Sequence, residues 1–167
     1  DAVSYGVSAT PTELSLTDID ADGLADIIGG GPNVWIARHD LAVDFSRSEI
    51  LTAPTAAATA AGDVNGDGLL DVVTGNNDST VSVFLRHGDG SFDAPTEYPS
   101  EIYAKAVHLA DVNGDGSMDL VVTSEDSDSG LTGVLYGLGD GRFSETTLLP
   151  VEHHPRGVAL IDVNGDR

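Results

Sequence analysis

Short apolar runs alternate along this chain with stretches of Gly, Asp, Asn and Ser. Residues 106–110 form one such run, residues 120–122 form the next, and residues 81–85 alternate between apolar and polar positions. Runs that are short, rich in β-branched residues and bounded by Gly, Asp and Asn are typical of strands rather than helices. No segment shows a sustained helical period with capping residues. The pattern therefore predicts an all-β protein.

An Asp-rich segment recurs four times and divides the chain into repeats. Its first residue is Asp18, Asp63, Asp111 and Asp162, so successive copies lie 45, 48 and 51 residues apart. A Gly-Asp-Gly sequence with a Phe two residues later follows the second and third copies, at 88–92 and 139–143. Each repeat is therefore expected to run strand, Asp loop, strand, variable loop, strand, Gly-Asp-Gly turn, strand.

Four strands in about 45–50 residues match the four-stranded antiparallel blade of a β-propeller. We expect a single partial propeller domain over residues 1–167, with repeats at about 13–52, 57–102 and 105–151 and a truncated repeat at 156–167. This is about three and a half blades, whereas propellers close with roughly four to eight. The remaining blades are therefore expected in the same chain, of which this would be a fragment, or in a second copy.

The Asp-rich loops place oxygen-bearing side chains at alternate positions, which suits the binding of Ca²⁺. Positions 1, 3 and 5 are Asp or Asn, and position 9 is Asp in the three complete copies. Ca²⁺ takes roughly six to eight oxygen ligands, and a tight loop of this spacing directs them to one point. Gly at position 6 permits the sharp turn, and position 7 is expected to contribute a backbone carbonyl.

The candidate metal ligands follow directly from these positions. The first loop offers Asp18, Asp20, Asp22, Leu24 and Asp26. The second offers Asp63, Asn65, Asp67, Leu69 and Asp71, and the third offers Asp111, Asn113, Asp115, Ser117 and Asp119. The incomplete fourth copy offers Asp162, Asn164 and Asp166.

The loop is similar to the first half of an EF-hand, but it lacks the Glu at position 12 and the flanking helices. Position 12 is Gly29, Thr74 or Val122. The Asp loops, the apolar run after each and the Gly-Asp-Gly-x-Phe turns resemble instead the FG-GAP (VCBS-type) repeat of integrin α-subunit propellers and bacterial surface proteins. This resemblance covers nearly the whole chain. It implies that each loop joins the first two strands of a blade and binds Ca²⁺.

Composition narrows the possible partners. Asp and Glu number 28 against 7 Lys and Arg, which gives a net charge of −21. Such a surface repels nucleic acids and anionic membranes, and no apolar stretch is long enough to insert into a bilayer. The chain has no Cys, which excludes disulfides and thiolate metal sites.

Aromatic residues are few, and we expect them to fill the core. Phe45, Phe92 and Phe143 are predicted to anchor neighbouring blades. Trp35 is aligned with Phe84 and Leu135 and is predicted to pack in the same way.

The leading hypothesis for function is an extracellular or surface-displayed Ca²⁺-binding module for adhesion or protein interaction, as the resemblance implies. A carbohydrate-binding, lectin-like propeller and a non-catalytic accessory domain of a larger secreted enzyme are the alternatives. The partner is thus a protein or a glycan. No nucleophile elbow, phosphate-binding loop or catalytic dyad emerges, so we do not expect the chain to be an enzyme.

Overall fold

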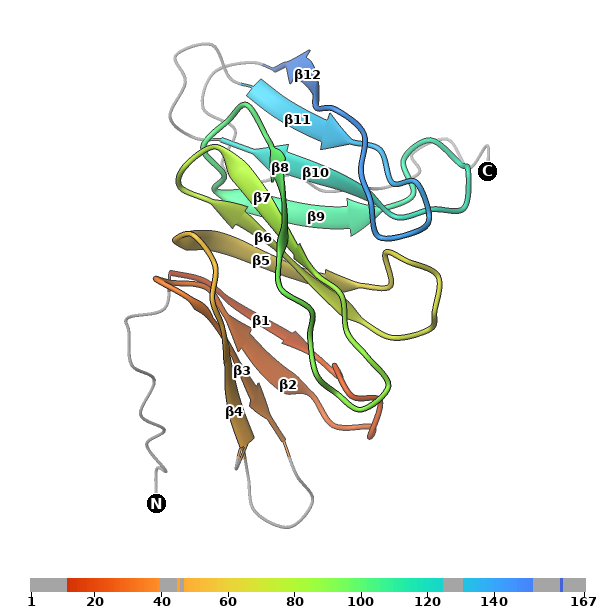
Figure 1. Ribbon diagram of the computed structural model, residues 1–167. Helices are drawn as coiled ribbons and strands as arrows, with labels where there is room; N and C mark the ends of the chain where they lie inside the picture. The colour runs from red at the N-terminus through yellow and green to blue at the C-terminus, as the bar shows by residue number, and fades with distance from the viewer. Residues whose placement is uncertain (1–11, 40–44, 46, 125–130, 152–159, 161–167) are drawn as a thin grey trace.

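The computed structural model describes residues 12–39, 45, 47–124, 131–151 and 160, and it contains three four-stranded antiparallel sheets (Figure 1). The first sheet consists of β1 (Leu14–Thr17), β2 (Asp26–Gly29), β3 (Val34–Arg38) and β4 (Arg47–Leu51). The second consists of β5 (Ala56–Gly62), β6 (Asp71–Asn76), β7 (Thr80–Phe84) and β8 (Thr96–Pro99). The third consists of β9 (Ala106–Ala110), β10 (Asp119–Thr123), β11 (Leu131–Leu135) and β12 (Thr147–Pro150).

The three sheets are the blades of an incomplete propeller, as the sequence predicted. Strands within each sheet pair in chain order, and no sheet closes on itself. The first strands of successive blades are neighbours, because β5 contacts both β1 and β9 (Figure 1). The described part of the chain contains no helix, and therefore none that could span a membrane.

The hydrophobic core lies between consecutive blades. Ile28, Ile36 and Phe84 are fully or almost fully buried in the cluster between the first and second blades. Val73 and Leu120 are buried in the cluster between the second and third blades. Each blade is therefore held by apolar burial against its neighbour, as in other repeat architectures.

The Gly-Asp-Gly sequences form the predicted turns. Gly90 and Gly141 have φ angles of 85° and 82°, a region that residues with a Cβ adopt at a cost. Phe92 and Phe143 follow these turns and form isolated bridges with Arg86 and Gly137, two residues beyond the ends of β7 and β11. Phe143 is buried in the core, and Phe92 packs against the first cluster, which confirms their role as anchors.

The predicted alignment of Trp35 with Phe84 and Leu135 is wrong by two residues. In the strand register, Phe84 pairs with Val72 and Ala37 pairs with Ile27, the residues that directly follow position 9 of their Asp loops. Ala37 is therefore the counterpart of Phe84. Trp35 lies on the same face of β3 as Ala37, the face turned away from the second blade, and it is half-buried. Its indole fills the space that a Cβ at Gly29 would need.

Candidate metal centre

The Asp loops connect the first two strands of each blade, as predicted. Residues 18–25 join β1 to β2, residues 63–70 join β5 to β6, and residues 111–118 join β9 to β10. All three loops lie at the same edge of the blades, on the right in Figure 1. They share this position because each loop connects a pair of facing residues. The last residue of the first strand pairs with the first residue of the second strand, and the loop joins the two.

The position 1 carboxylate holds the turn of each loop. In the second loop, Asp63 Oδ1 accepts the N–H groups of Gly66 and Asp67 at 2.7 and 3.2 Å. Its Oδ2 accepts the N–H of Gly68 at 2.9 Å. Asp111 makes the equivalent three bonds in the third loop. Because these donors point inward, the loop wraps around the first Asp and brings the later oxygen-bearing side chains near it.

Positions 3 and 5 are linked directly in the second and third loops. Asn65 Oδ1 accepts the N–H of Asp67 at 3.0 Å, and Asn65 Nδ2 donates to Asp67 Oδ2 at 3.0 Å. Asp67 Oδ1 also accepts the N–H of Leu69 at 2.8 Å. In the third loop the Asn113 amide donates to Asp115 at 2.8 Å. One amide side chain therefore satisfies part of the neighbouring carboxylate in each of these loops.

The first loop brings three carboxylates together instead. Asp18, Asp20 and Asp22 each offer an oxygen, and these oxygens lie within 4.8 Å of one another. Asp18 accepts the N–H groups of Asp22 and Gly23 at 3.0 and 2.8 Å, and Asp22 accepts that of Leu24 at 2.8 Å. Asp20 Oδ1 is buried and has no hydrogen-bond partner among the described residues. A buried acceptor without a donor is costly, and a cation in the triad would satisfy it.

Position 9 has a second role that the sequence did not reveal. Asp26, Asp71 and Asp119 are fully buried at the first residue of the second strand. Asp71 Oδ2 accepts the N–H of Val64, at position 2 of the loop, and its Oδ1 accepts the N–H of Arg86, beyond the third strand, at 3.0 and 2.8 Å. Asp26 and Asp119 make the equivalent two bonds. The position 9 carboxylate thus ties the loop to the third strand.

Electrostatics at this clamp favour a nearby cation. Burial raises the pKa of Asp71 above its usual range, the two N–H donors oppose this rise, and the charges of Asp67 and Asp63 add to it. Burial likewise raises the pKa of Asp26, and the carboxylates of Asp20 and Asp22 act in the same direction. A bound divalent cation would reverse these repulsions, because it stabilises the ionised form of every carboxylate around it.

The remaining predicted ligands are only partly placed. Leu24, Leu69 and Ser117 at position 7 donate their N–H groups to position 5, and the ligand role of their carbonyls stays a prediction. The ligand role of position 9 also stays a prediction, since each oxygen there already accepts one N–H. Residues of the incomplete fourth copy, Asp162, Asn164 and Asp166, lie outside the described residues.

Neighbouring blades also meet beside these loops. The N–H of Gly141, in the third blade's turn, donates to Val64 O in the second blade's Asp loop at 3.0 Å. Arg38, at the end of β3, donates from Nη2 to Gly90 O at 2.9 Å and to Glu49 at 3.2 Å. The sequence contained the Gly-Asp-Gly turns, but nothing in it indicated that they dock onto the preceding blade.

Comparison with protein families gives three overlapping matches to the FG-GAP-like repeat, at residues 18–74, 63–122 and 111–167. Each match begins at the first Asp of a loop and includes the following Asp-rich copy. The chain belongs to the FG-GAP-like repeat family. No curated protein matches it. FG-GAP repeats form β-propeller-like interaction modules and are typically extracellular, which agrees with the blades and the exposed Asp loops seen here.

Proposed function

We propose that this FG-GAP repeat protein is a Ca²⁺-binding, non-catalytic module that acts outside the cell and contacts a protein partner. The Asp loops would hold the ions, and the blades would present the interaction surface. Loops with this number of carboxylates fill at the millimolar Ca²⁺ of extracellular fluids when they bind weakly, as extracellular modules do. The net charge of −21 supports the same proposal, since bound cations offset part of the repulsion.

The observation that carries the metal proposal is the unsatisfied oxygen of Asp20. Three carboxylate oxygens within 4.8 Å repel one another, and Asp20, one of the three residues, has a buried oxygen without a donor. Such a set fits a hard divalent cation, which prefers carboxylate oxygens. Asp18, Asp20 and Asp22 would hold the ion in the first loop, and Asp63, Asn65 and Asp67 are the corresponding residues in the second. The bound ion would supply positive charge that fixes the loop.

Calcium titration tests this proposal. We expect three ions, one for each complete loop, by calorimetry and native mass spectrometry, which brings the net charge from −21 to −15 because each ion adds two. Asp67→Ala should remove one ion and leave two, because each loop is built from its own residues. Asp78→Ala, at an exposed turn outside the loops, is the control. A stoichiometry that does not depend on Asp67 would contradict the assignment.

A further blade is proposed to cover the outer face of the first sheet. Leu14 and Leu16 on β1 are 57% and 71% exposed, and Ile50 on β4 is 56% exposed. By strand register, the counterpart of Leu14 in the third blade is Val107, which is 5% exposed because the second blade covers it. The covering sheet would come from further repeats of the same chain or from a second copy. Light scattering with Ca²⁺ distinguishes them: a discrete dimer supports the second copy, and a monomer that binds no apolar dye contradicts both.

A further inference from the structure

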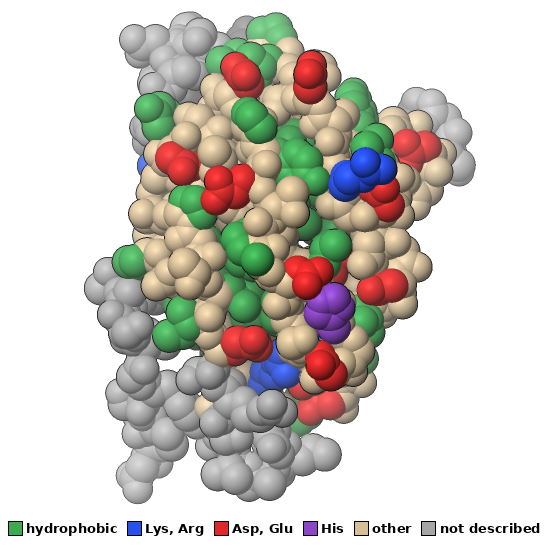
Figure 2. Space-filling model, in the orientation of Figure 1, with side chains coloured by type: hydrophobic (Ala, Val, Ile, Leu, Met, Phe, Trp, Pro, Cys, Tyr) green, Lys and Arg blue, Asp and Glu red, His purple; other side chains and the backbone are tan. Residues whose placement is uncertain are grey.

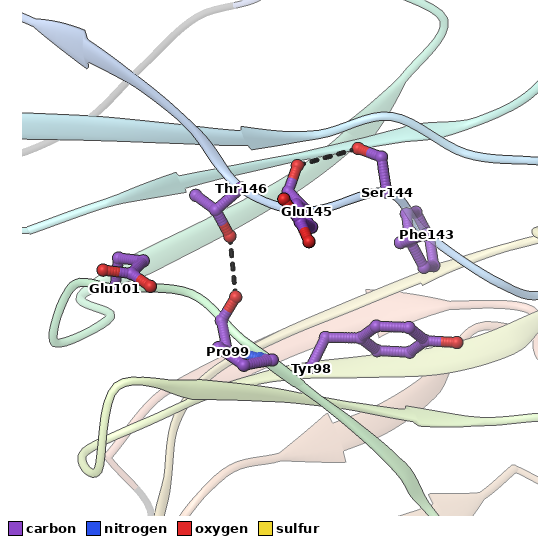
Figure 3. Close-up of a pocket in the computed structure, with 7 residues that line it drawn as sticks. All are labelled: Tyr98, Pro99, Glu101, Phe143, Ser144, Glu145 and Thr146. Atoms are coloured by element: carbon purple, nitrogen blue, oxygen red, sulfur yellow. Dashed lines mark hydrogen bonds between the residues drawn. The ribbon is translucent and has the colours of Figure 1, made fainter.

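A hollow of about 430 Å³ opens between the second and third blades, away from the Asp loops. One wall is formed by the end of β8 and the residue after Ser100, and the other by the segment that leads into β12. Figure 3 shows the residues that line it: Tyr98, Pro99, Glu101, Phe143, Ser144, Glu145 and Thr146. The hollow is therefore built by two blades, and its shape depends on their packing.

The floor of the hollow is aromatic and firmly held. The rings of Tyr98 and Phe143 meet edge to face, with centroids 5.8 Å apart and planes at 78°. Phe143 is 6% exposed and belongs to the core between the blades. Thr146 Oγ1 donates to Pro99 O at 2.6 Å and ties the two walls together (Figure 3). A ligand would thus meet a preformed aromatic surface.

The hydroxyl groups of Ser144 and Thr146, on one wall of the hollow, are already used by the protein. Thr146 donates to the opposite wall, as stated above. Ser144 Oγ donates to Glu145 O and accepts the N–H of Tyr136, both at 2.9 Å. These two hydroxyls therefore have no proton left to donate to a ligand.

Two carboxylates, in contrast, remain available. Glu101 and Glu145 are exposed, and neither carboxylate has a hydrogen bond or ion pair with the described part of the chain. Glu101 has a φ of 64°, which is unusual for a residue with a side chain. Buried Ser100 fixes this conformation, because its N–H donates to Ser79 O and its Oγ donates to Ile102 O, both at 2.8 Å. The carboxylate of Glu101 is thus presented at the rim by a rigid turn.

None of the described residues that line the hollow is Lys or Arg. Arg142, beside Phe143 in the chain, is bound to Asp140 through Nε and Nη2 at 2.8 and 2.6 Å. Acidic side chains also outnumber Lys and Arg on the face of the molecule seen in Figure 2. The hollow is therefore an acceptor site with an aromatic floor.

We propose that this hollow binds a cationic side chain, an arginine or a lysine, presented by a protein partner. A guanidinium or ammonium group pairs with carboxylates through charge-assisted hydrogen bonds and is attracted to an aromatic ring. The hollow offers carboxylate acceptors beside aromatic rings, and such a side chain supplies the matching charged donors. This inference rests on the protein-binding part of the proposed function, and it names the chemistry of the partner at one site. It does not depend on the Asp loops.

The test uses the full chain with saturating Ca²⁺ and two short peptides, acetyl-Gly-Arg-Gly-amide and its citrulline counterpart, which lacks the charge. We expect NMR shift changes at Tyr98, Phe143 and Thr146 with the arginine peptide and much smaller changes with the citrulline peptide. Glu101→Gln and Glu145→Gln should each weaken binding by about three- to fivefold, the size of an exposed ion pair. Higher salt should weaken binding further, because the pairs are open to solvent.

Glu97→Gln is the matched control, because Glu97 is exposed on β8 outside the hollow and its replacement removes the same charge. Equal weakening by Glu97→Gln would overturn the proposal, since it would show general attraction to an acidic surface. Equal binding of the citrulline peptide, or shifts in the hollow with a neutral oligosaccharide instead, would also overturn it.

Calcium stoichiometry of the Glu101→Gln, Glu145→Gln double variant is measured in parallel. Unchanged stoichiometry with lost peptide binding supports both proposals, and peptide binding without any bound Ca²⁺ contradicts the metal proposal alone.

Discussion

The first Asp loop and the two that follow it share one backbone path but differ at position 3. In the second loop the Asn65 amide donates to the Asp67 carboxylate at 3.0 Å, and the third loop has the same pair. In the first loop Asp20 has no donor to offer, and its Oδ1 is buried without a partner. A single exchange of amide for carboxylate therefore turns an internal hydrogen bond into a repulsion between like charges.

This difference teaches that the repeats are not equally dependent on a cation. The second and third loops satisfy their carboxylates with their own N–H groups and amides. The first loop, with an oxygen left over and Ala21 held at a φ of 61° where the other loops have Gly66 and Gly114, is the more strained. We infer that Ca²⁺ contributes most to the folding of the first blade. The predictions that follow separate what the loops share from what distinguishes them.

The largest effect is expected from the position 9 clamp, which all three loops share. Asp71→Ala leaves the buried N–H groups of Val64 and Arg86 without their acceptor. An unsatisfied buried donor costs about 1–3 kcal/mol, so for two donors we expect a loss of roughly 2–6 kcal/mol. Denaturant unfolding in chelator measures this loss without a contribution from bound metal. Asp71→Asn keeps one acceptor oxygen and should lose less.

Asp78→Ala is the control for this prediction. Asp78 accepts hydrogen bonds only at an exposed turn, from Thr80 N at 3.2 Å and Thr80 Oγ1 at 2.6 Å. If Asp71→Ala and Asp78→Ala were equally stable in chelator, the position 9 carboxylate would not be a structural clamp. The same pair of hydrogen bonds at position 9 in all three blades would then need another cause.

Exchange of Asp for Asn at position 3 should give the next largest change in stability. The change should have opposite signs in chelator and in Ca²⁺. Asp20→Asn removes one of three crowded charges, which at about 4 Å in water repel by about 1 kcal/mol a pair. The variant should therefore be more stable than the native protein in chelator, by about 1–2 kcal/mol, because Asp20 takes part in two of the three pairs. In Ca²⁺ it should be less stable, because the affinity of such loops depends on the charge of their ligands. Thermal unfolding of the native protein and the variant, in chelator and in Ca²⁺, measures this reversal of the stability difference.

Asn65→Asp is the reciprocal change and should make the second loop behave like the first. It replaces the amide that donates to Asp67 by a carboxylate, so stability in chelator should fall and the gain on adding Ca²⁺ should grow. If Asp20→Asn and Asn65→Asp changed stability in chelator in the same direction, position 3 would not control the difference between the loops.

Much of this fold was predictable because the repeat fixes it. Short β-branched runs and Gly-Asp-Gly turns gave the strands and their order, and the spacing of Asp18, Asp20 and Asp22 indicated the cluster that the structure shows. The side chains of a strand alternate between its two faces, so an error of two residues along β3 leaves Trp35 on a plausible face but opposite the wrong neighbours. Only the strand pairing revealed that Ala37 is the counterpart of Phe84.

Other parts of the site could not be predicted, because they depend on contacts between distant segments. Position 9 was expected to be a ligand, but its hydrogen bond to Arg86 N requires knowing where the third strand ends. The hollow requires Tyr98 of one blade to face Phe143 of the next, 45 residues later. Sequence periodicity reports what recurs within a repeat, whereas these features lie between repeats.

The smallest effect is expected from a feature that distinguishes the turns of the second and third blades. His87 Nε2 contacts Asp93 Oδ1 at 2.8 Å, whereas the corresponding positions of the third blade, by turn hydrogen bonds, are Leu138 and Ser144. The hydrogen bond to Asp93 and its charge raise the pKa of His87 above 6.5. A raised pKa in the folded state means that the protonated form stabilises the fold. This contribution is complete below pH 6.5 and is lost as pH rises through the folded-state pKa.

His87→Leu should therefore reduce the loss of stability between pH 6 and pH 9, and the reduction should be small because both side chains are more than half exposed. Thermal unfolding with saturating Ca²⁺ at the two pH values measures it, and the difference between native and variant protein removes the contribution of the other histidines. Asp93→Asn removes the charge while an acceptor oxygen remains, so it should give part of the same reduction. A native protein and a His87→Leu variant with identical pH dependence would show that the pair is too exposed to matter, and the turns of the second and third blades would then be equivalent in stability.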